Sequence, residues 1–231
     1  MSTVRRSVEQ TISRLVLRTL RERASLAGTP AARADAPLAL ATLIDQTLAH
    51  PVDAATLAAF CARAVEHGFG CVVVPLVHVA ACADLLGGSS VRVGVALDSA
   101  DSLESALAAG AGEIELEPPA ELLHAEDRLG AWLAWLGDRC VAAGAVGKLN
   151  LLRADLAAAE LLRICASAAT CQLGLVVLPE AIVTEGQRAL QSTIGIKVAN
   201  IVTLEAARQA LAAGAARLGT ANGTELIEAA R

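Results

Sequence analysis

Short apolar runs recur along the chain from residue 38 onward, and each run is followed by a stretch rich in alanine and leucine. Runs of this length are typical of buried strands, and the stretches between them have the composition of helices. The pattern occurs eight times and therefore predicts eight strand–helix pairs. The predicted strands are Leu43–Leu48, Cys71–Val74, Val91–Leu97, Glu113–Glu117, Val146–Leu151, Leu173–Leu178, Ile194–Val198 and Arg217–Gly219.

Small-residue turns end several of the predicted helices just before the next strand. They lie at 67–68, 109–111, 143–144 and 213–215, and each contains a glycine that can adopt the left-handed conformation that closes a helix. Strands that alternate with helices form parallel sheets, and eight such pairs predict an α/β fold of the closed (β/α)8 TIM barrel type. A doubly wound open sheet is the alternative, but no glycine-rich dinucleotide loop follows the first predicted strand.

The N-terminal part of the chain does not share this pattern. Residues 3–25 place apolar residues at helical spacing, with arginines on the other faces, which predicts an amphipathic helix. Residues 26–37 contain glycine, two prolines and many small residues, as a linker does. We therefore divide the chain into an N-terminal helix and linker, 1–37, and a barrel, 38–231. Such an arm commonly packs on a barrel or on a second subunit, so we expect a homo-oligomer.

Composition and charge restrict the classes of partner. The net charge is −5 and aromatic residues make up 2%, so the basic stripe and the stacking rings of a nucleic-acid binder are missing. No apolar run has the length of a membrane helix, and no signal-peptide core follows the N-terminal arginines, which favours a cytoplasmic protein without a membrane partner. The six cysteines lack metal-site spacing and are expected to be buried thiols. We expect a small-molecule substrate and neither a metal nor an organic cofactor.

Lysine is nearly absent from the chain. Lysine and arginine total 19, and only Lys148 and Lys197 are lysines. A buried lysine can lose its proton and act as a nucleophile, which arginine cannot do. Both lysines lie within or at the end of a predicted strand, and the active sites of barrels lie at the carboxyl ends of their strands. Other candidates at strand ends are Asp45, Glu115, Asn150, Glu180, Asn200, Thr220 and Asn222.

Five segments, taken in order, resemble the deoxyribose-phosphate aldolase family. They are 43–48 (LIDQTL), 67–69 (HGF), 110–115 (GAGEIE), 195–197 (GIK) and 213–220 (AGAARLGT). Their order and most of their spacing agree with the family from the first segment to the end of the chain. The resemblance implies a class I aldolase barrel, in which a strand lysine attacks an aldehyde to form an imine. The resulting enamine then adds to a second aldehyde.

The resemblance also implies roles for individual residues. Lys197 matches the family's second lysine, which is thought to lower the pKa of the imine-forming lysine, and Lys148 matches a lysine on the fifth strand. Glu115 takes the place of a fourth-strand aspartate that moves protons, and Asp45 takes the place of the first-strand acid. An amine must be neutral to attack a carbonyl, so burial or a neighbouring cation has to lower its pKa.

The sequence departs from the family at residues that its usual reaction requires. The family's imine-forming lysine lies on the sixth strand in a K-T-S-T-G motif, and the corresponding stretch here is 176–180 (VVLPE), with Leu178 in place of the lysine. The glycine pair after the seventh strand lets backbone amides approach a substrate phosphate, and 199–200 (AN) stands there instead. Two serines of the eighth strand become 221–222 (AN). We therefore expect a reaction other than cleavage of 2-deoxyribose 5-phosphate.

Three interpretations remain open. In the first, covalent chemistry on a small carbonyl substrate is retained at Lys197 or Lys148, and Glu115 or Asp45 moves protons. In the second, the barrel is a lyase, isomerase or cyclase that uses acid–base catalysis without an imine. In the third, the chain is a binding or scaffold protein whose lysines form ion pairs with those acids. The residues expected to bind the substrate are Asn150, Glu180, Asn200, Thr220 and Asn222.

Overall fold

Eight parallel strands close into a barrel in the computed structural model of this chain, which describes residues 37–152, 154, 156–190 and 194–231. Each strand pairs with the next one in sequence, and the first pairs with the last, so the sheet has no free edge. The predicted (β/α)8 TIM barrel is therefore confirmed. The strands are β1 (Ile44–Thr47), β2 (Cys71–Val73), β3 (Arg92–Leu97), β4 (Glu113–Leu116), β5 (Val146–Asn150), β6 (Leu175–Leu178), β7 (Gly195–Val198) and β8 (Arg217–Thr220).

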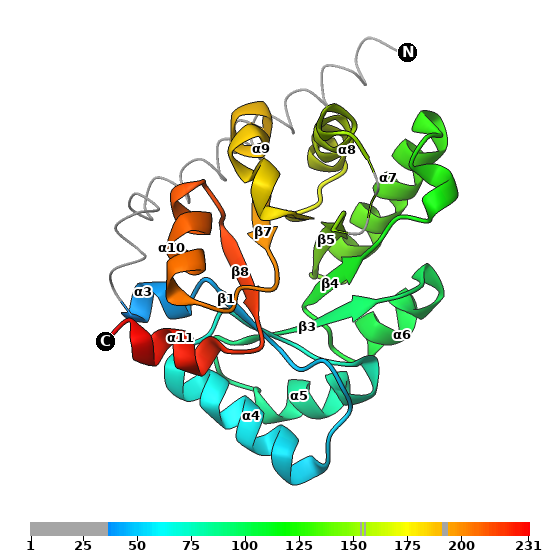
Figure 1. Cartoon of the computed structure of the whole chain (residues 1–231). Coiled ribbons are helices and arrows are strands. Elements are labelled where there is room, and N and C mark those ends of the chain that lie inside the picture. Colours follow the sequence, from blue (N-terminus) through cyan, green and yellow to red (C-terminus); the bar gives the residue numbers. More distant parts are fainter. Residues whose placement is uncertain (1–36, 153, 155, 191–193) are drawn as a thin grey trace.

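Helices surround the barrel and alternate with the strands along the chain (Figure 1). The first of them precedes β1, and each of the others follows a strand. They are α3 (Pro37–Ala41), α4 (Ala54–His67), α5 (Val79–Leu85), α6 (Leu103–Ala108), α7 (Glu126–Ala142), α8 (Ala158–Thr170), α9 (Val183–Leu190), α10 (Leu204–Ala212) and α11 (Gly223–Ala229). Short 3-10 turns follow β2, β3, β4 and β6: η1 (Leu76–His78), η2 (Ala100–Ser102), η3 (Ala120–Leu122) and η4 (Glu180–Ile182).

Local side chains explain where several helices begin and end. At the start of α4 the Asp53 carboxylate accepts a hydrogen bond from the backbone N–H of Thr56. At the start of α10 the Thr203 hydroxyl accepts one from the backbone N–H of Ala206. Gly68 ends α4 with φ of 70°, the left-handed conformation expected of the small-residue turns. These caps determine where the chain leaves each helix.

The hydrophobic core lies between the outer face of the barrel and the ring of helices. Outward-pointing strand residues such as Val72, Ile114, Leu149 and Ile196 are apolar and inaccessible to solvent. Alternate residues of each strand point into the lumen, which in many barrels is filled by aliphatic side chains. Here the lumen also contains buried aspartate, glutamate and lysine side chains. The fold therefore places a cluster of charges on the barrel axis.

The predicted amphipathic helix and most of the predicted linker lie outside the described residues, which begin at Pro37. The division into 1–37 and 38–231 therefore stays a prediction. Within the part of the chain that the structure describes, no helix is long and apolar enough to cross a membrane.

Candidate active site in the barrel lumen

Charged side chains from β1, β4, β5, β7 and β8 meet inside the barrel. Paired residues of neighbouring parallel strands point to the same side of the sheet. Lys148 pairs with Glu115, and Lys197 pairs with Arg217, so these side chains share the lumen. By the same register, the inward-facing residues of the odd-numbered strands form one layer, and those of the even-numbered strands form the layers below and above it. The polar lumen residues are Asp45, Glu113, Glu115, Lys148, Asn150, Lys197 and Arg217.

The lower cluster consists of Asp45, Glu113, Lys148 and Arg217. The Nζ of Lys148 lies 2.6 Å from Oδ2 of Asp45 and 2.5 Å from Oε2 of Glu113. Arg217 contacts Oδ1 of Asp45 through Nη2, and its Nη1 lies 3.5 Å from Oε1 of Glu113. Lys148 is 1% exposed and Asp45 is inaccessible to solvent. Two buried carboxylates are therefore paired with two cations, as buried charges require, and Arg92 at the amino end of β3 lies 3.6 Å from Oε1 of Glu113.

These contacts hold the lower cluster in its charged state. Burial alone would raise the pKa of Asp45, but the charges of Lys148, Lys197 and Arg217 outweigh it and hold that pKa well below its usual range. Burial alone would lower the pKa of Lys148, but nearby negative charge, that of Asp45 above all, raises it beyond the ordinary lysine value. Lys148 therefore keeps its proton at neutral pH and is unsuited to attack a carbonyl.

The upper cluster consists of Lys197, Glu115 and Asn150 and lies nearer the carboxyl ends of the strands. The Nζ of Lys197 lies 2.7 Å from Oε2 of Glu115 and 3.1 Å from Oδ2 of Asp45. The other carboxylate oxygen of Glu115 accepts a hydrogen bond of 2.9 Å from Nδ2 of Asn150. The backbone N–H of Leu152 donates to Oδ1 of Asn150, which fixes the direction of that amide. Glu115 is thus held at both oxygens, one of them directed at the Lys197 amine.

Two small residues give the upper cluster space. Ala96 pairs with Glu115 and therefore faces the lumen, yet it is exposed, so solvent reaches the barrel mouth at this point. Gly219 makes room for Lys197, because a Cβ at this glycine would lie only 2.8 Å from Cε of the lysine. A small molecule that enters the mouth therefore meets the upper cluster first.

The sixth strand presents a valine to this site, and this corrects the sequence-based placement of Leu178. Val177 pairs with Lys197 and faces the lumen beside it, whereas Leu178 pairs with Val198 and points outward. Cδ1 of Leu178 lies against Gly186 of α9. The placement of Leu178 at the lysine position is therefore wrong by one residue. Neither side chain can form an imine, so β6 still offers no nucleophile.

The remaining predicted substrate-binding residues lie in or beside the loops that follow β6, β7 and β8. Asn200 is exposed and has φ of 61°, an uncommon conformation that asparagine tolerates better than most residues. Thr220 points away from the lumen, and its hydroxyl bonds to the backbone oxygen of Ile201 at 2.5 Å and to the backbone N–H of Asn222 at 2.9 Å. The structure brings together Asp45, Glu115, Lys148, Asn150 and Lys197, and leaves Glu180, Asn200 and Asn222 at the rim.

Sequence reasoning missed two members of the network, Glu113 and Arg217. A signal for Glu113 was available, because residues two apart in a strand share a face and Glu113 precedes Glu115 by two positions. Arg217 is the first residue of β8, where the rule that active sites lie at carboxyl ends does not direct attention. Both residues lie at the amino ends of their strands and support the site from below.

One group of side chains in the lumen has the spacing of a metal site. Asp45, Cys71 and Glu113 offer ligand atoms within 4.8 Å of one another. The two carboxylates already contact Lys148 and Arg217, so a metal ion would have to displace an ammonium or a guanidinium. Burial also raises the pKa of Cys71, which keeps the thiol protonated and makes it a poor ligand. The protein's own cations thus take the place that a metal would occupy.

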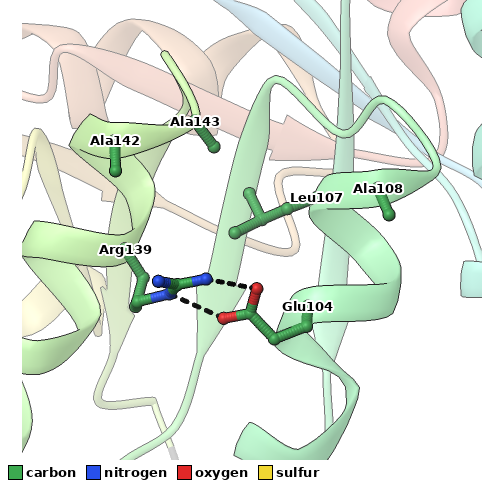
Figure 2. Close-up of a pocket in the computed structure, with 6 residues that line it drawn as sticks. All are labelled: Glu104, Leu107, Ala108, Arg139, Ala142 and Ala143. Carbon is green, nitrogen blue, oxygen red and sulfur yellow. Dashed lines mark hydrogen bonds and ion pairs between the residues drawn. The ribbon is translucent and has the colours of Figure 1, made fainter.

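A surface pocket lies outside the barrel, between α6 and α7. Figure 2 shows Glu104 and Arg139 paired across it. The Arg139 guanidinium donates to both carboxylate oxygens of Glu104, at 2.7 and 2.5 Å. Leu107, Ala142 and Ala143 at the carboxyl ends of the two helices also line it, and these ends lie at the face of a barrel that serves stability. The pocket is therefore separate from the candidate active site.

Comparisons with known proteins agree on the type of barrel. No family model matches the chain. In sequence the chain is similar to the deoxyribose-phosphate aldolase of Bacteroides thetaiotaomicron, with 28% identity over 213 residues that cover 82% of this chain and 90% of the relative. In structure it is similar to the tetrameric deoxyribose phosphate aldolase of Aeropyrum pernix, with a TM-score of 0.77, 21% identity and coverage of 87% of this chain and 94% of that one.

A second solved structure, an aldolase called QR15, has a TM-score of 0.72 at 19% identity and covers 82% of this chain and 95% of that one. A triosephosphate isomerase from Bartonella henselae, by contrast, gives a TM-score of 0.54. Together these comparisons confirm the resemblance that the sequence predicts.

Proposed function

We propose that this relative of the deoxyribose-phosphate aldolases makes or breaks a carbon–carbon bond in a small carbonyl compound, with Lys197 as the amine that forms the imine. The reaction differs from cleavage of 2-deoxyribose 5-phosphate, because β6 offers Val177 beside Lys197 and no lysine. Lys197 lies on the neighbouring strand and faces the same lumen. The strand that supplies the nucleophile can therefore differ between related barrels, because neighbouring strands face the same lumen and the fold does not change.

The contact between Lys197 and Glu115 carries this proposal. Imine formation needs a neutral amine and a group that takes up and returns protons within hydrogen-bond distance of it. Oε2 of Glu115 lies 2.7 Å from Nζ of Lys197, in the cluster nearest the solvent-exposed Ala96. Asn150 holds the other oxygen, so the carboxylate keeps this direction.

In the proposed reaction Glu115 first takes a proton from Lys197, and the neutral amine attacks the carbonyl carbon of the substrate. A proton of the attacking nitrogen passes to the carbonyl oxygen, which becomes a hydroxyl group. Glu115 then returns its proton to that hydroxyl group, which leaves as water and gives the iminium. The carboxylate then removes the proton from the carbon next to the iminium carbon. The enamine adds to the carbonyl carbon of a second molecule, whose oxygen takes the proton that Glu115 now carries and becomes a hydroxyl group. Water hydrolyses the product iminium and restores Lys197.

The acids and cations of the lower cluster have a supporting role in this scheme. Asp45 stays ionised and contacts the nitrogens of both lysines, so it positions Lys197 from below. Lys148 stays protonated and balances Asp45 and Glu113. Substrate contacts from Glu180, Asn200, Thr220 and Asn222 remain predictions.

A second function is favoured by the same ion pairs. Contacts of 2.7 and 3.1 Å to two carboxylates suit a charged ammonium, so Lys197 can instead stabilise an enolate while Glu115 moves a proton. This is the non-imine lyase, isomerase or cyclase. Ion pairs of Lys148 with Asp45 and of Lys197 with Glu115 are also what a non-catalytic binding or scaffold protein would show.

Borohydride trapping distinguishes the three functions. The protein is incubated with a panel of small aldehydes and ketones, reduced, weighed intact and mapped by peptide. We expect an adduct on Lys197 in the wild type and in Lys148→Arg, and none in Lys197→Arg, because arginine keeps the charge but cannot form an imine. An adduct on Lys148 would contradict the assigned roles.

The absence of any adduct in the wild type would exclude the imine. Turnover of a carbonyl compound that partly survives in Lys197→Arg would then support acid–base catalysis. Binding of a compound without turnover would support the non-catalytic role.

The role of Glu115 has a separate test. Glu115→Gln keeps the size of the side chain and one acceptor oxygen but cannot take up a proton from the amine. We expect the rate of adduct formation to fall by about 100-fold or more, the usual contribution of a positioned acid–base group. An unchanged rate would exclude Glu115 from this role.

We further propose that the protein is a cytoplasmic homo-oligomer. The relative from Aeropyrum pernix is tetrameric, and the predicted arm 1–37 is of a kind that commonly packs on a second subunit. Light scattering of the full chain and of a chain without residues 1–37 tests this. A monomeric full chain would contradict the proposal, and an oligomer that survives the deletion would exclude the arm from assembly.

A further inference from the structure

We infer that the substrate carries no phosphate or other anionic group and is an uncharged, hydroxylated aldehyde or ketone. This inference rests on the proposed function, because it names the class of compound that the same site takes. Its grounds are the charges on the barrel rim, the hydrogen bonds of the turn after β8, and the ion pairs of the lumen.

Exposed carboxylates lie in three of the loops that follow the strands and form the rim of the barrel mouth. Asp98 and Asp101 follow β3, Glu121 follows β4 and Glu180 follows β6, and all four are exposed. In the sequence of these loops Arg153 is the single lysine or arginine, and it lies outside the described residues. A phosphate monoester carries nearly two negative charges at neutral pH. A carboxylate at contact distance in water repels each unit of that charge by about 1 kcal/mol. The rim therefore opposes the approach of a phosphorylated compound.

Barrel enzymes frequently bind a phosphate at the loops after β7 and β8, and here neutral groups already accept hydrogen bonds from backbone N–H groups of the turn after β8. The backbone N–H of Asn222 donates to the Thr220 hydroxyl, and the backbone N–H of Gly223 donates to Oε1 of Gln46 at 2.7 Å. Nε2 of Gln46 donates in turn to the backbone oxygen of Ala221 at 2.7 Å. Gln46 thus spans this turn from the outer face of β1. A phosphate would have to displace these bonds before it could use the same donors.

Each cation that the structure places in the lumen is already paired with a carboxylate, which leaves none of them free for an anionic substrate. Lys148, Lys197 and Arg217 contact Asp45, Glu113 or Glu115, and Arg92 at the amino end of β3 lies 3.6 Å from Oε1 of Glu113. The first turn of α11 carries a further acid, Glu225. The polar side chains of the turns after β7 and β8 include two carboxamides, Asn200 and Asn222. Carboxamides donate and accept hydrogen bonds without charge, as the hydroxyl and carbonyl groups of an uncharged substrate require.

A matched pair of substrates tests the inference. Glyceraldehyde and glyceraldehyde 3-phosphate share the aldehyde and differ in the phosphate, and each is trapped with borohydride at equal concentration. We expect the Lys197 adduct to form at least about 10-fold faster with the unphosphorylated compound, which corresponds to about 1.4 kcal/mol. An equal or faster rate with the phosphorylated compound would overturn the inference and leave the proposed function intact.

Two double variants test the electrostatic cause. Asp98→Asn with Glu121→Gln removes two charges from the rim, and Glu66→Gln with Glu228→Gln removes two exposed charges from the far ends of α4 and α11. We expect the rim variant to lower the ratio of the glyceraldehyde rate to the glyceraldehyde 3-phosphate rate by about 3-fold, because exposed charges contribute modest energies. We expect the matched control to leave this ratio unchanged. A ratio that is unchanged in both variants would refute the role of the rim.

If no carbonyl compound is trapped at all, the proposed function is rejected. Titration with inorganic phosphate still tests the inference in that case. The wild-type protein is expected to give no saturable heat with phosphate in the millimolar range by calorimetry. Saturable binding in that range would overturn the inference whatever the fate of the imine.

Discussion

The lower and upper clusters of the lumen surround the same kind of residue with different partners. Lys148 contacts two buried carboxylates, and the second cation beside them is Arg217. Lys197 contacts Glu115, whose other oxygen bonds to a neutral amide, in the cluster next to an exposed alanine. A lysine enclosed by charges keeps its proton and stabilises the fold. Lys197 is 3% exposed, but it belongs to the cluster nearer the mouth, through which a substrate enters.

The direction in which each lysine leans produces this difference. Both lysines belong to the layer of the odd-numbered strands, and both contact Oδ2 of Asp45. Lys148 leans toward Glu113, and Lys197 leans toward Glu115, two residues nearer the carboxyl end of β4. A step of two residues along one strand, about 7 Å, therefore separates the supporting cluster from the reactive one.

The largest effect is expected when each lysine is replaced by methionine, which has a similar length and no charge. Lys148→Met removes a cation that lies within 2.6 Å of both Asp45 and Glu113 in a dry environment, so we expect the free energy of unfolding to fall by about 3–5 kcal/mol. Lys197→Met leaves Glu115 with its Asn150 bond and Asp45 with its other two cations, and the expected loss is about 1–2 kcal/mol. Urea unfolding of both variants measures the difference. Equal losses would contradict the division of the lumen into two clusters.

The lower cluster also predicts a pH dependence of stability. The pKa of Asp45 is lower in the folded than in the unfolded chain, so its contribution is complete above about pH 4 and is lost as the pH falls further, toward the folded pKa. The pKa of Lys148 is higher in the folded chain, so its contribution is complete below about pH 10 and is lost as the pH rises through the folded pKa. These two groups therefore stabilise the fold fully between those limits.

Asp45→Asn provides the comparison for the acid side. The variant is less stable at neutral pH, but it lacks the carboxylate that must be protonated in acid. We expect its free energy of unfolding, measured in urea from neutral to acid pH, to fall less steeply than that of the wild type. Parallel curves would show that Asp45 does not contribute to the acid sensitivity of the fold.

Much of the fold was predictable because barrel strands and helices are coded locally. Each strand is a short buried run, and each small-residue turn, such as the one at Gly68, ends a helix before the next strand begins. The site was predictable in part for a related reason. Lysine is so rare in this chain that its two lysines, Lys148 and Lys197, stood out as candidates for the site in the lumen. The acids predicted at strand ends, Asp45 and Glu115, contact these two lysines.

The remainder depends on register, which a single sequence does not specify. A shift of one residue exchanges the inward and outward faces of a strand, and for this reason Leu178 was placed where Val177 lies. Glu113, which is buried, and Arg217, which is half-buried, join the network through contacts among four strands, which no local pattern records. The link between Gln46 and Gly223 joins residues at opposite ends of the barrel sequence and follows only from closure of the sheet.

A smaller effect is expected when the upper cluster is loosened. Asn150→Leu removes the amide that holds Oε1 of Glu115, and the carboxylate loses its fixed direction toward Lys197. We expect the maximal rate of imine formation to fall by about 10-fold, the cost of one hydrogen bond to a charged group. The substrate concentration at half-maximal rate should change little. A rise in that concentration with an unchanged maximal rate would instead assign Asn150 to substrate binding.

The smallest effect is expected outside the barrel, at the pair of Glu104 and Arg139 (Figure 2). Both side chains are exposed, so water and salt screen their attraction, and exposed pairs contribute little to stability. Arg139→Ala should lower the unfolding midpoint less than any variant above, and the difference should shrink further in high salt. The rate of imine trapping should not change, because the pocket lies away from the mouth. A loss of trapping rate as large as that of Asn150→Leu would show that the outer surface, and not the lumen alone, controls the chemistry.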